Sequence, residues 1–156
     1  LAPTSPSTVL SQPPEQLEPR AEALLEEGRT AAASGNVDGA IDAYESALTV
    51  EPGSVTVLLS LADATRRQGM QGKALHYYRV ALASDPRNVT ALAGEGLALA
   101  EKGATEKANR NLARLQTLCG ANCSETRTLA AAIAKGPSPR MVTADAVAPK
   151  PVVSEN

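Results

Sequence analysis

The middle of the chain repeats itself every 34 residues. When residues 21–54 are written above 55–88 and 89–122, one column holds Gly35, Gly69 and Gly103. A fixed period of this length without insertions is typical of a solenoid, in which each unit packs only on its neighbours. The period therefore predicts a binding scaffold and leaves the ligand open. Three further columns hold Ala40, Ala74 and Ala108; Tyr44, Tyr78 and Leu112; and Pro52 and Pro86.

The composition favours closely packed helices. The chain of 156 residues is long enough for one domain, and it contains no Trp, no Phe and only 2% aromatic residues. A core of Ala, Leu and Val suits helices that approach closely, and suits a β-sandwich poorly. No apolar run approaches the roughly 20 residues that span a bilayer, so we expect no transmembrane helix.

Each unit carries start and stop signals for two helices. The first unit predicts helices near 21–33 and 37–50, with Gly35 supplying the left-handed conformation that ends the first one. Pro52 and Pro86 follow the second helix of their units and stop it. The polar residues that close the three units are predicted to cap the next helix; they are Ser54, Asn88 and Asn122.

The two ends of the chain differ from the repeats in composition. Residues 1–20 contain five Pro, and residues 136–156 contain four. Pro blocks helix formation, and too little apolar area remains to offset the entropy of ordering. We therefore predict a disordered or extended leader over 1–20 and a disordered tail over 136–156.

The net charge of −2 conceals an uneven distribution. Residues 1–65 contain ten acidic and two basic residues, whereas residues 66–156 contain seven acidic and thirteen basic residues. Two interpretations stay open: solvated helix faces of uneven composition, or a dipolar rod that docks end to end or steers a charged partner. Nucleic-acid binding is disfavoured, because the basic residues are dispersed and lack aromatic neighbours for stacking.

Cys119 and Cys123 are the only cysteines, and they flank a three-residue turn. Structural zinc needs about four ligands, and His76, the only His, lies in another unit. A small disulfide and two unreactive thiols both fit the spacing; we favour the disulfide, which favours an oxidising compartment. Together with the Pro-rich leader and a start at Leu1 rather than Met, it predicts an exported, periplasmic or secreted bacterial protein. A cytoplasmic location is the alternative.

No constellation of catalytic residues survives inspection. The glycines occupy helix-hairpin positions rather than a phosphate loop after a strand, and His76 has no second His to pair with. The adjacent carboxylates of Glu26 and Glu27 lie on a predicted solvated helix face. We expect no enzyme, no cofactor and no metal.

The repeat columns resemble the tetratricopeptide repeat (TPR). A small residue stands eighth, Gly fifteenth, Ala twentieth, an aromatic twenty-fourth and Pro thirty-second in the 34-residue unit. The resemblance covers 21–122 and weakens in the third unit, at Leu112, Leu115 and Gly120. Residues 124–135 are similar to the capping helix of such a domain, with Leu129 and Ile133 facing inward.

The resemblance implies an all-α fold, a right-handed solenoid of antiparallel helix pairs whose inner groove binds a peptide or a partner's helix. It also implies that the first helix of each unit lines the groove. The family's carboxylate clamp of Lys and Asn has no counterpart here, which makes a chaperone-tail receptor an unfavoured assignment. The candidate groove residues are Glu22, Leu25, Arg29, Ala32, Thr56, Leu59, Asp63, Arg66, Thr90, Ala93 and Leu97.

The resemblance and the missing catalytic groups together predict a protein–protein interaction scaffold in an exported bacterial complex. The alternative is a structural or accessory subunit that assembles through charge-complementary ends, or through tails that become ordered on a neighbour.

Overall fold

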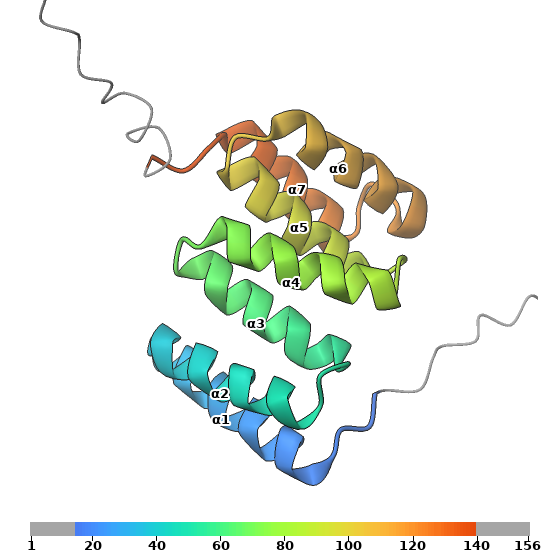
Figure 1. The fold of residues 1–156 in the computed structure, drawn as a ribbon. Helices are drawn as coiled ribbons and strands as arrows, with labels where there is room; N and C mark the ends of the chain where they lie inside the picture. The colour runs from blue at the N-terminus through green and yellow to red at the C-terminus, as the bar shows by residue number, and fades with distance from the viewer. Residues whose placement is uncertain (1–14, 140–156) are drawn as a thin grey trace, which may run out of the picture.

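The structure, a computed structural model, describes residues 15–139 as a stack of helices (Figure 1). No strand occurs within this range, and each predicted unit forms one helix pair. A seventh helix follows the third pair, as predicted for the cap. The helices are α1 (Pro19–Ala33), α2 (Val37–Val50), α3 (Val55–Arg67), α4 (Gln71–Ser84), α5 (Val89–Glu101), α6 (Thr105–Cys119) and α7 (Ser124–Lys135).

The turn inside each helix pair depends on its glycine. Gly35, Gly69 and Gly103 have φ angles of 81°, 88° and 83°, in the left-handed region that other residues adopt at a steric cost. Side chains cap the N-termini of the first helices in the second and third units. Ser54 accepts a hydrogen bond from the Val57 N–H at the start of α3, and Asn88 accepts one from the Ala91 N–H at the start of α5. These features confirm the predicted glycine turns and two of the three predicted caps.

The third predicted cap is wrong. The residue that precedes α7 is Cys123, whose side chain makes no capping hydrogen bond, and Asn122 is exposed in the turn before it. The reason lies in the third unit, where Gly120 replaces the Pro of the other units and takes a φ of 89°. The connection therefore follows a different path, and the helix starts one residue later.

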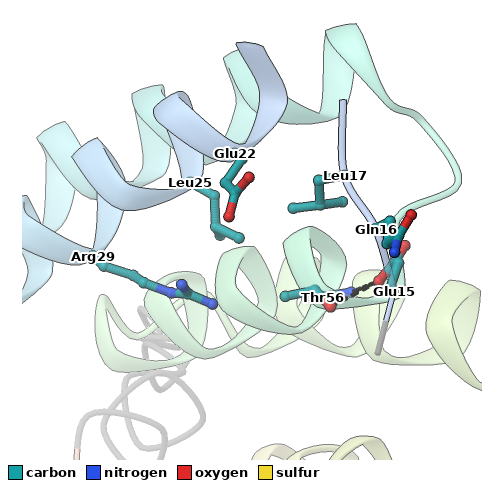
Figure 2. A pocket seen from close by; sticks show the side chains of 7 residues that line it. All are labelled: Glu15, Gln16, Leu17, Glu22, Leu25, Arg29 and Thr56. Atoms are coloured by element: carbon teal, nitrogen blue, oxygen red, sulfur yellow. Dashed lines mark hydrogen bonds between the residues drawn. The ribbon is translucent and has the colours of Figure 1, made fainter. Parts of the chain in front are cut away.

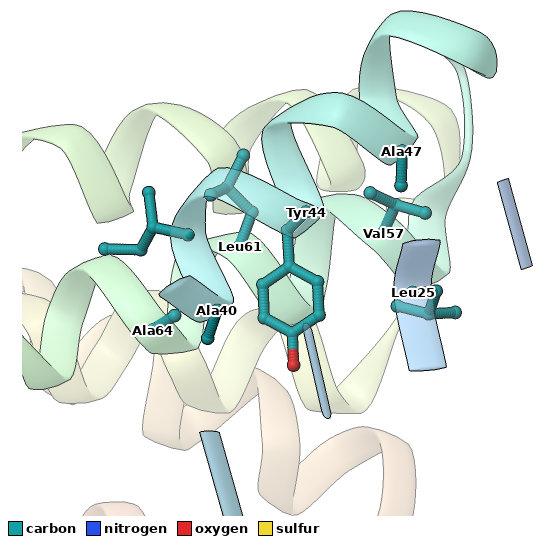
Figure 3. Close-up of a cluster of buried hydrophobic side chains, with 8 residues drawn as sticks. Leu25, Ala40, Tyr44, Ala47, Val57, Leu61 and Ala64 are labelled. Carbon is teal, nitrogen blue, oxygen red and sulfur yellow. The ribbon is translucent and has the colours of Figure 1, made fainter. Parts of the chain in front are cut away.

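Small residues allow the two helices of the first pair to touch. A Cβ atom added to Gly28 of α1 would lie 2.3 Å from Cε1 of Tyr44 on α2, closer than any real contact. The ring of Tyr44 lies at the centre of a buried cluster with Leu25, Val57 and Leu61 (Figure 3). The same side chains therefore join α1 to α2 and the first pair to the second.

The pairs stack in chain order, from α1 and α2 at one end to α6 and α7 at the other (Figure 1). Within the stack, α5 packs directly against α3 and against α7. The first helices of successive units thus lie side by side, and α7 continues their row. We call the face lined by α1, α3, α5 and α7 the inner face.

The described part of each predicted tether is ordered against the stack. In the predicted leader, Pro19 and Arg20 already belong to α1, and Leu17 packs against the buried cluster around Tyr44. In the predicted tail, the Ser138 N–H donates to the carbonyl of Glu101 at the end of α5. The rest of both predicted tethers, residues 1–14 and 140–156, lies outside the described residues.

Candidate binding groove

Three hollows follow the inner face from one end of the stack to the other. The N-terminal pocket, of about 410 Å³, lies between the residue 15–17 segment, α1 and α3. The middle pocket, of about 180 Å³, lies between the first and second pairs, and the C-terminal pocket, of about 260 Å³, lies between α3, α5 and α7. The N-terminal and C-terminal pockets are therefore lined mainly by inner-face helices, whereas α2 also lines the middle pocket.

Ten of the eleven candidate groove residues line one of these pockets. The exception is Arg66. Leu25 and Ala93 line a pocket while most of their surface is buried, so they shape its floor and belong to the core. By pocket, the N-terminal one has Glu22, Leu25, Arg29 and Thr56; the middle one has Ala32 and Asp63; and the C-terminal one has Leu59, Asp63, Thr90, Ala93 and Leu97.

The N-terminal pocket is closed on one side by the chain itself. The carboxylate of Glu15 accepts hydrogen bonds from the N–H groups of Val55 and Thr56 and from the Thr56 hydroxyl, at 3.1, 2.9 and 2.7 Å. These donors are the free groups at the start of α3, where a negative charge is stabilised. Figure 2 shows Glu15 and Thr56 meeting at the edge of the pocket, with Leu17 on the side of α1.

The hydrogen bonds of Glu15 alter its acidity. Partial burial alone would raise the pKa of this carboxyl, because it disfavours the charged form. The bonds from Thr56, Ser54 and Val55 stabilise the carboxylate and outweigh that effect, so the pKa of Glu15 lies below its ordinary value of 4.5. The carboxylate is therefore charged at neutral pH and holds the segment before α1 against α3.

Arg66 points into an ion-pair network behind the middle of the inner face. Its guanidinium donates to Asp63, at 2.9 Å, and to Glu101 of α5. Arg67 binds the other oxygen of Asp63 at 2.7 Å, and Gln71 donates to Glu101 at 3.1 Å. The network connects α3 to α5, so Arg66 links these two helices, and it lines none of the three pockets.

The C-terminal pocket has the most apolar lining of the three. Leu59 of α3 and Leu97 of α5 are half-buried at its sides, and the ring of Tyr78 lies beneath it against Gly94. A Cβ atom on Gly94 would lie 2.2 Å from Cε1 of Tyr78, so only glycine leaves room for this ring. Burial raises the pKa of Tyr78 to about 12, which keeps its hydroxyl neutral.

Helix α7 supplies the outer wall of the C-terminal pocket. Leu129 of α7 is fully buried against the third unit, where a Cβ atom on Gly96 would lie 2.5 Å from it. This contact seats α7 where a fourth first helix would pack. The α7 side chains that reach the pocket are Ser124, Glu125 and Thr128.

Cys119 and Cys123 form a disulfide across the turn from α6 to α7, with Cα atoms 5.9 Å apart. The buried hydroxyl of Thr126 lies beside both sulfurs and donates to the carbonyl of Gly120 at 2.9 Å. A carboxylate oxygen of Glu125 lies within 4.8 Å of both sulfurs, but bonded sulfurs are not the thiolates that bind metals. In this state the pair links the wall of the C-terminal pocket to α6.

Several pocket residues are not among the predicted groove residues, and two sets of them lie at the ends of the inner face. The first is residues 15–17, which were assigned to the leader; the Pro-rich context hid them. The second is the α7 set at the C-terminal pocket. Its signal was available, because a capping helix that occupies the place of a first helix should line the groove as first helices do.

His76 is exposed on α4 and packs edge-to-face against its neighbour Tyr77. Of the helices between residues 15 and 139, none is long and apolar enough to cross a membrane.

Stacked antiparallel helix pairs with a recessed inner face define an α-helical repeat protein. The sequence matches the family model of the tetratricopeptide repeat over residues 25–79 and 72–114, which is more than half of the chain. The chain belongs to the tetratricopeptide repeat family, as the 34-residue columns predict, and its fold is an all-α TPR solenoid. A search of curated protein sequences finds no match.

Solved structures agree on the fold. The TPR domain of Sgt2 from Aspergillus fumigatus is 24% identical, with a TM-score of 0.69 over 90% of this chain and 92% of that one. The TPR2B domain of yeast Sti1 in its pHsp70 complex is 20% identical, with a TM-score of 0.69 over 76% and 96%. The Yersinia enterocolitica type III secretion chaperone SycD, solved with a peptide of the translocator YopD, is 20% identical, with a TM-score of 0.63 over 79% and 89%.

Proposed function

We propose that this protein is a non-enzymatic scaffold that binds a peptide segment or a helix of a partner protein on its inner face. TPR proteins in general are interaction scaffolds, and two similar structures hold peptides: SycD has a YopD peptide, and a TPR domain of RPAP3 has the HSP90 peptide SRMEEVD. The similarity of those chains is one of fold, so the identity of the ligand does not transfer.

One observation carries the proposal. Leu59 and Leu97 lie on two neighbouring helices, stay partly exposed and line the same pocket, which has a mainly apolar lining. Exposed apolar side chains that gather in a hollow mark an interaction site, since burying them against a partner is favourable. A helix or an extended segment inserts such side chains into a groove of this kind.

The test is whether the purified protein captures a partner from a lysate of the native organism, with the captured proteins identified by mass spectrometry. Changing Leu59 and Leu97 together to Glu should abolish capture, because charged groups would then line the pocket. Thr90→Arg is a milder variant at an exposed position of the same pocket, and it should also weaken capture by steric blocking. Circular dichroism should show unchanged helicity for both.

Matched controls lie elsewhere on the stack. Val80→Glu and Thr117→Arg make the same kinds of change at exposed positions that line none of the three pockets. Both controls should capture the partner normally. Normal capture by the folded pocket variants would exclude the C-terminal pocket of the inner face as the binding site.

The location that we propose is an exported bacterial complex, periplasmic or secreted. The Cys119–Cys123 disulfide supports it, because disulfides persist in oxidising compartments and are rare in the cytosol. Alkylation of the native protein before and after reduction, in separated cell fractions, tests this directly. Two cysteines that react without reductant would contradict the exported location.

A second role, self-assembly end to end, is supported by where the stack places its charges. Helices α1 and α2 contain six acidic and two basic residues, whereas α6 and α7 contain two acidic and five basic residues. These pairs form opposite ends of the stack (Figure 1), so head-to-tail contact would join unlike charges. Sizing across salt concentrations tests this role: assembly should weaken with salt, and a salt-independent monomer excludes it.

A further inference from the structure

The C-terminal pocket has an apolar floor with defined limits. The ring of Tyr78 fits against Gly94 because this residue has no side chain, and Leu59 and Leu97 line the same pocket. At about 260 Å³ the hollow itself has room for one or two side chains of a ligand. A ligand would therefore insert an aliphatic or similar apolar side chain here.

The charges around this floor leave a single uncompensated carboxylate. Asp63 lies at the rim, but it belongs to a network with Arg66, Arg67 and Glu101 in which two negative and two positive charges balance. Among residues 15–139, no Lys or Arg lines the pocket. Glu125 does, and the described partner of its carboxylate is the neutral hydroxyl of Ser124.

The position of Glu125 on α7 reinforces this assignment. It lies in the first turn of the helix, where the backbone contributes roughly half a positive charge. The full negative charge of the carboxylate outweighs that half charge, so the rim is negative. The basic residues of α7, Arg127 and Lys135, are exposed and line none of the pockets.

The N-terminal pocket offers a contrast that limits where such a ligand can bind. Its edge is already taken by Glu15, and Arg29 beside it is paired with Glu26. That pocket also contains the carboxylate of Glu22, but its lining is mainly polar, so the apolar hollow with a carboxylate at its rim lies at the other end of the inner face.

We propose that the C-terminal pocket binds a peptide segment that inserts an aliphatic side chain and places a neighbouring lysine or arginine on Glu125. The inference rests on the proposed function and adds the chemistry of the ligand. Opposite charges at an interface select among partners more than they add affinity. Glu125 therefore acts as a specificity determinant, and Leu59 and Leu97 provide the apolar contact.

The test is selection from a displayed library of random 12-residue peptides at physiological ionic strength. Peptides enriched on the native protein relative to Leu97→Gln, which removes the apolar contact without adding a charge, should carry more Lys and Arg than Asp and Glu. On Glu125→Lys the bias should reverse towards acidic peptides. For one enriched peptide, fluorescence polarisation should show binding about threefold to fivefold weaker to Glu125→Gln, as expected for one half-exposed ion pair. Arg127→Gln, which removes a charge from α7 at an exposed position outside the three pockets, should bind normally.

The outcomes separate this inference from the proposed function. Leu97-dependent peptides with a neutral or acidic composition, or equal affinity for native protein and Glu125→Gln, would overturn the charge selection and leave the groove in place. Absence of any Leu97-dependent enrichment would also overturn the inference. The proposed function would then fall only if partner capture were equally insensitive to the pocket variants.

Discussion

The two ends of the inner face share the same helix arrangement but differ in the elements that border their pockets. At both ends the first helix of a unit meets its neighbour over a hollow, as the repeat requires. At the N-terminal end, Glu15 and Leu17 from the segment before α1 border the pocket, and the pocket lining is mainly polar. At the C-terminal end α7 adds a wall, and the lining is mainly apolar.

The difference shows how a repeat protein gains a specific site. Equivalent columns of the repeat build equivalent walls, so repetition alone would give similar hollows along the stack. Distinct chemistry enters where the repeat stops: through the segment before the first unit, and through the capping helix after the last one. The elements that end the stack thereby also determine what its inner face can bind.

The largest expected effect concerns Leu129, which attaches α7 to the third unit. Its side chain is fully buried against Leu92 and Leu115, so Leu129→Ala should cost about 2–5 kcal/mol of unfolding free energy. Leu17→Ala at the other end removes a partly buried side chain and should cost less. Urea denaturation of both variants measures the difference. Equal losses would mean that the two ends are closed equally firmly.

Gly94→Ala should have the next largest effect, because it disturbs the floor of the C-terminal pocket. The new methyl group would meet the buried ring of Tyr78, and overpacking of this kind costs about 1–3 kcal/mol. Gly72→Ala in α4 is the matched control, since nothing lies within 4 Å of its added Cβ. The control should keep or slightly raise stability. A neutral Gly94→Ala would show that Tyr78 can leave the floor.

The sequence predicts the shared features of the two ends and misses the features that distinguish them. Gly35, Gly69 and Gly103 recur in one column because each turn needs a positive φ, so a single pattern specifies three turns. The contacts of Glu15 and the turn at Asn122 do not recur in the other units. The environments of these two residues depend on contacts with α3 and on the turn at Gly120, and no period reports such contacts.

The same limit applies to the groove lining. The repeat columns place Leu59 and Leu97 on the first helices of their units, and both residues line the C-terminal pocket. The columns also place Arg66 there, but the position of Glu101 on the adjacent unit draws its guanidinium into an ion-pair network. Side-chain direction at the groove is decided by pairs between units, and a repeat pattern read one unit at a time does not contain them.

Loss of the disulfide should have an intermediate effect, confined to the C-terminal end. Closing so short a loop stabilises a chain by up to about 2 kcal/mol in the chain-entropy model. Replacing both Cys119 and Cys123 by Ser should therefore loosen the junction of α6 and α7, which bears Ser124 and Glu125. Hydrogen exchange should rise in α7 and stay unchanged in α1. Unchanged exchange in α7 would mean that Leu129 alone holds the cap.

The smallest expected effect is at the N-terminal end, where Glu15→Gln weakens the contact with α3. A carboxylate at a helix start contributes about 0.5–1 kcal/mol, and its exposure places this one at the lower end. Because the pKa of Glu15 is lower in the folded chain than its ordinary 4.5, the native state binds fewer protons between the two values. The contribution is thus complete above about pH 4.5 and is lost as the pH falls through the native pKa.

Denaturation of the native protein and Glu15→Gln at pH 7 and at pH 3 measures this directly. The stability gap should be present at pH 7 and should shrink towards pH 3, because protonation of Glu15 removes the charge that distinguishes the two chains. Glu22→Gln removes the same charge from the same pocket without a hydrogen bond to α3, so it should show a smaller gap at pH 7. Equal gaps for the two variants would mean that Glu15 acts only through its charge and does not fasten the segment. The N-terminal pocket would then be as open to a ligand as the C-terminal one.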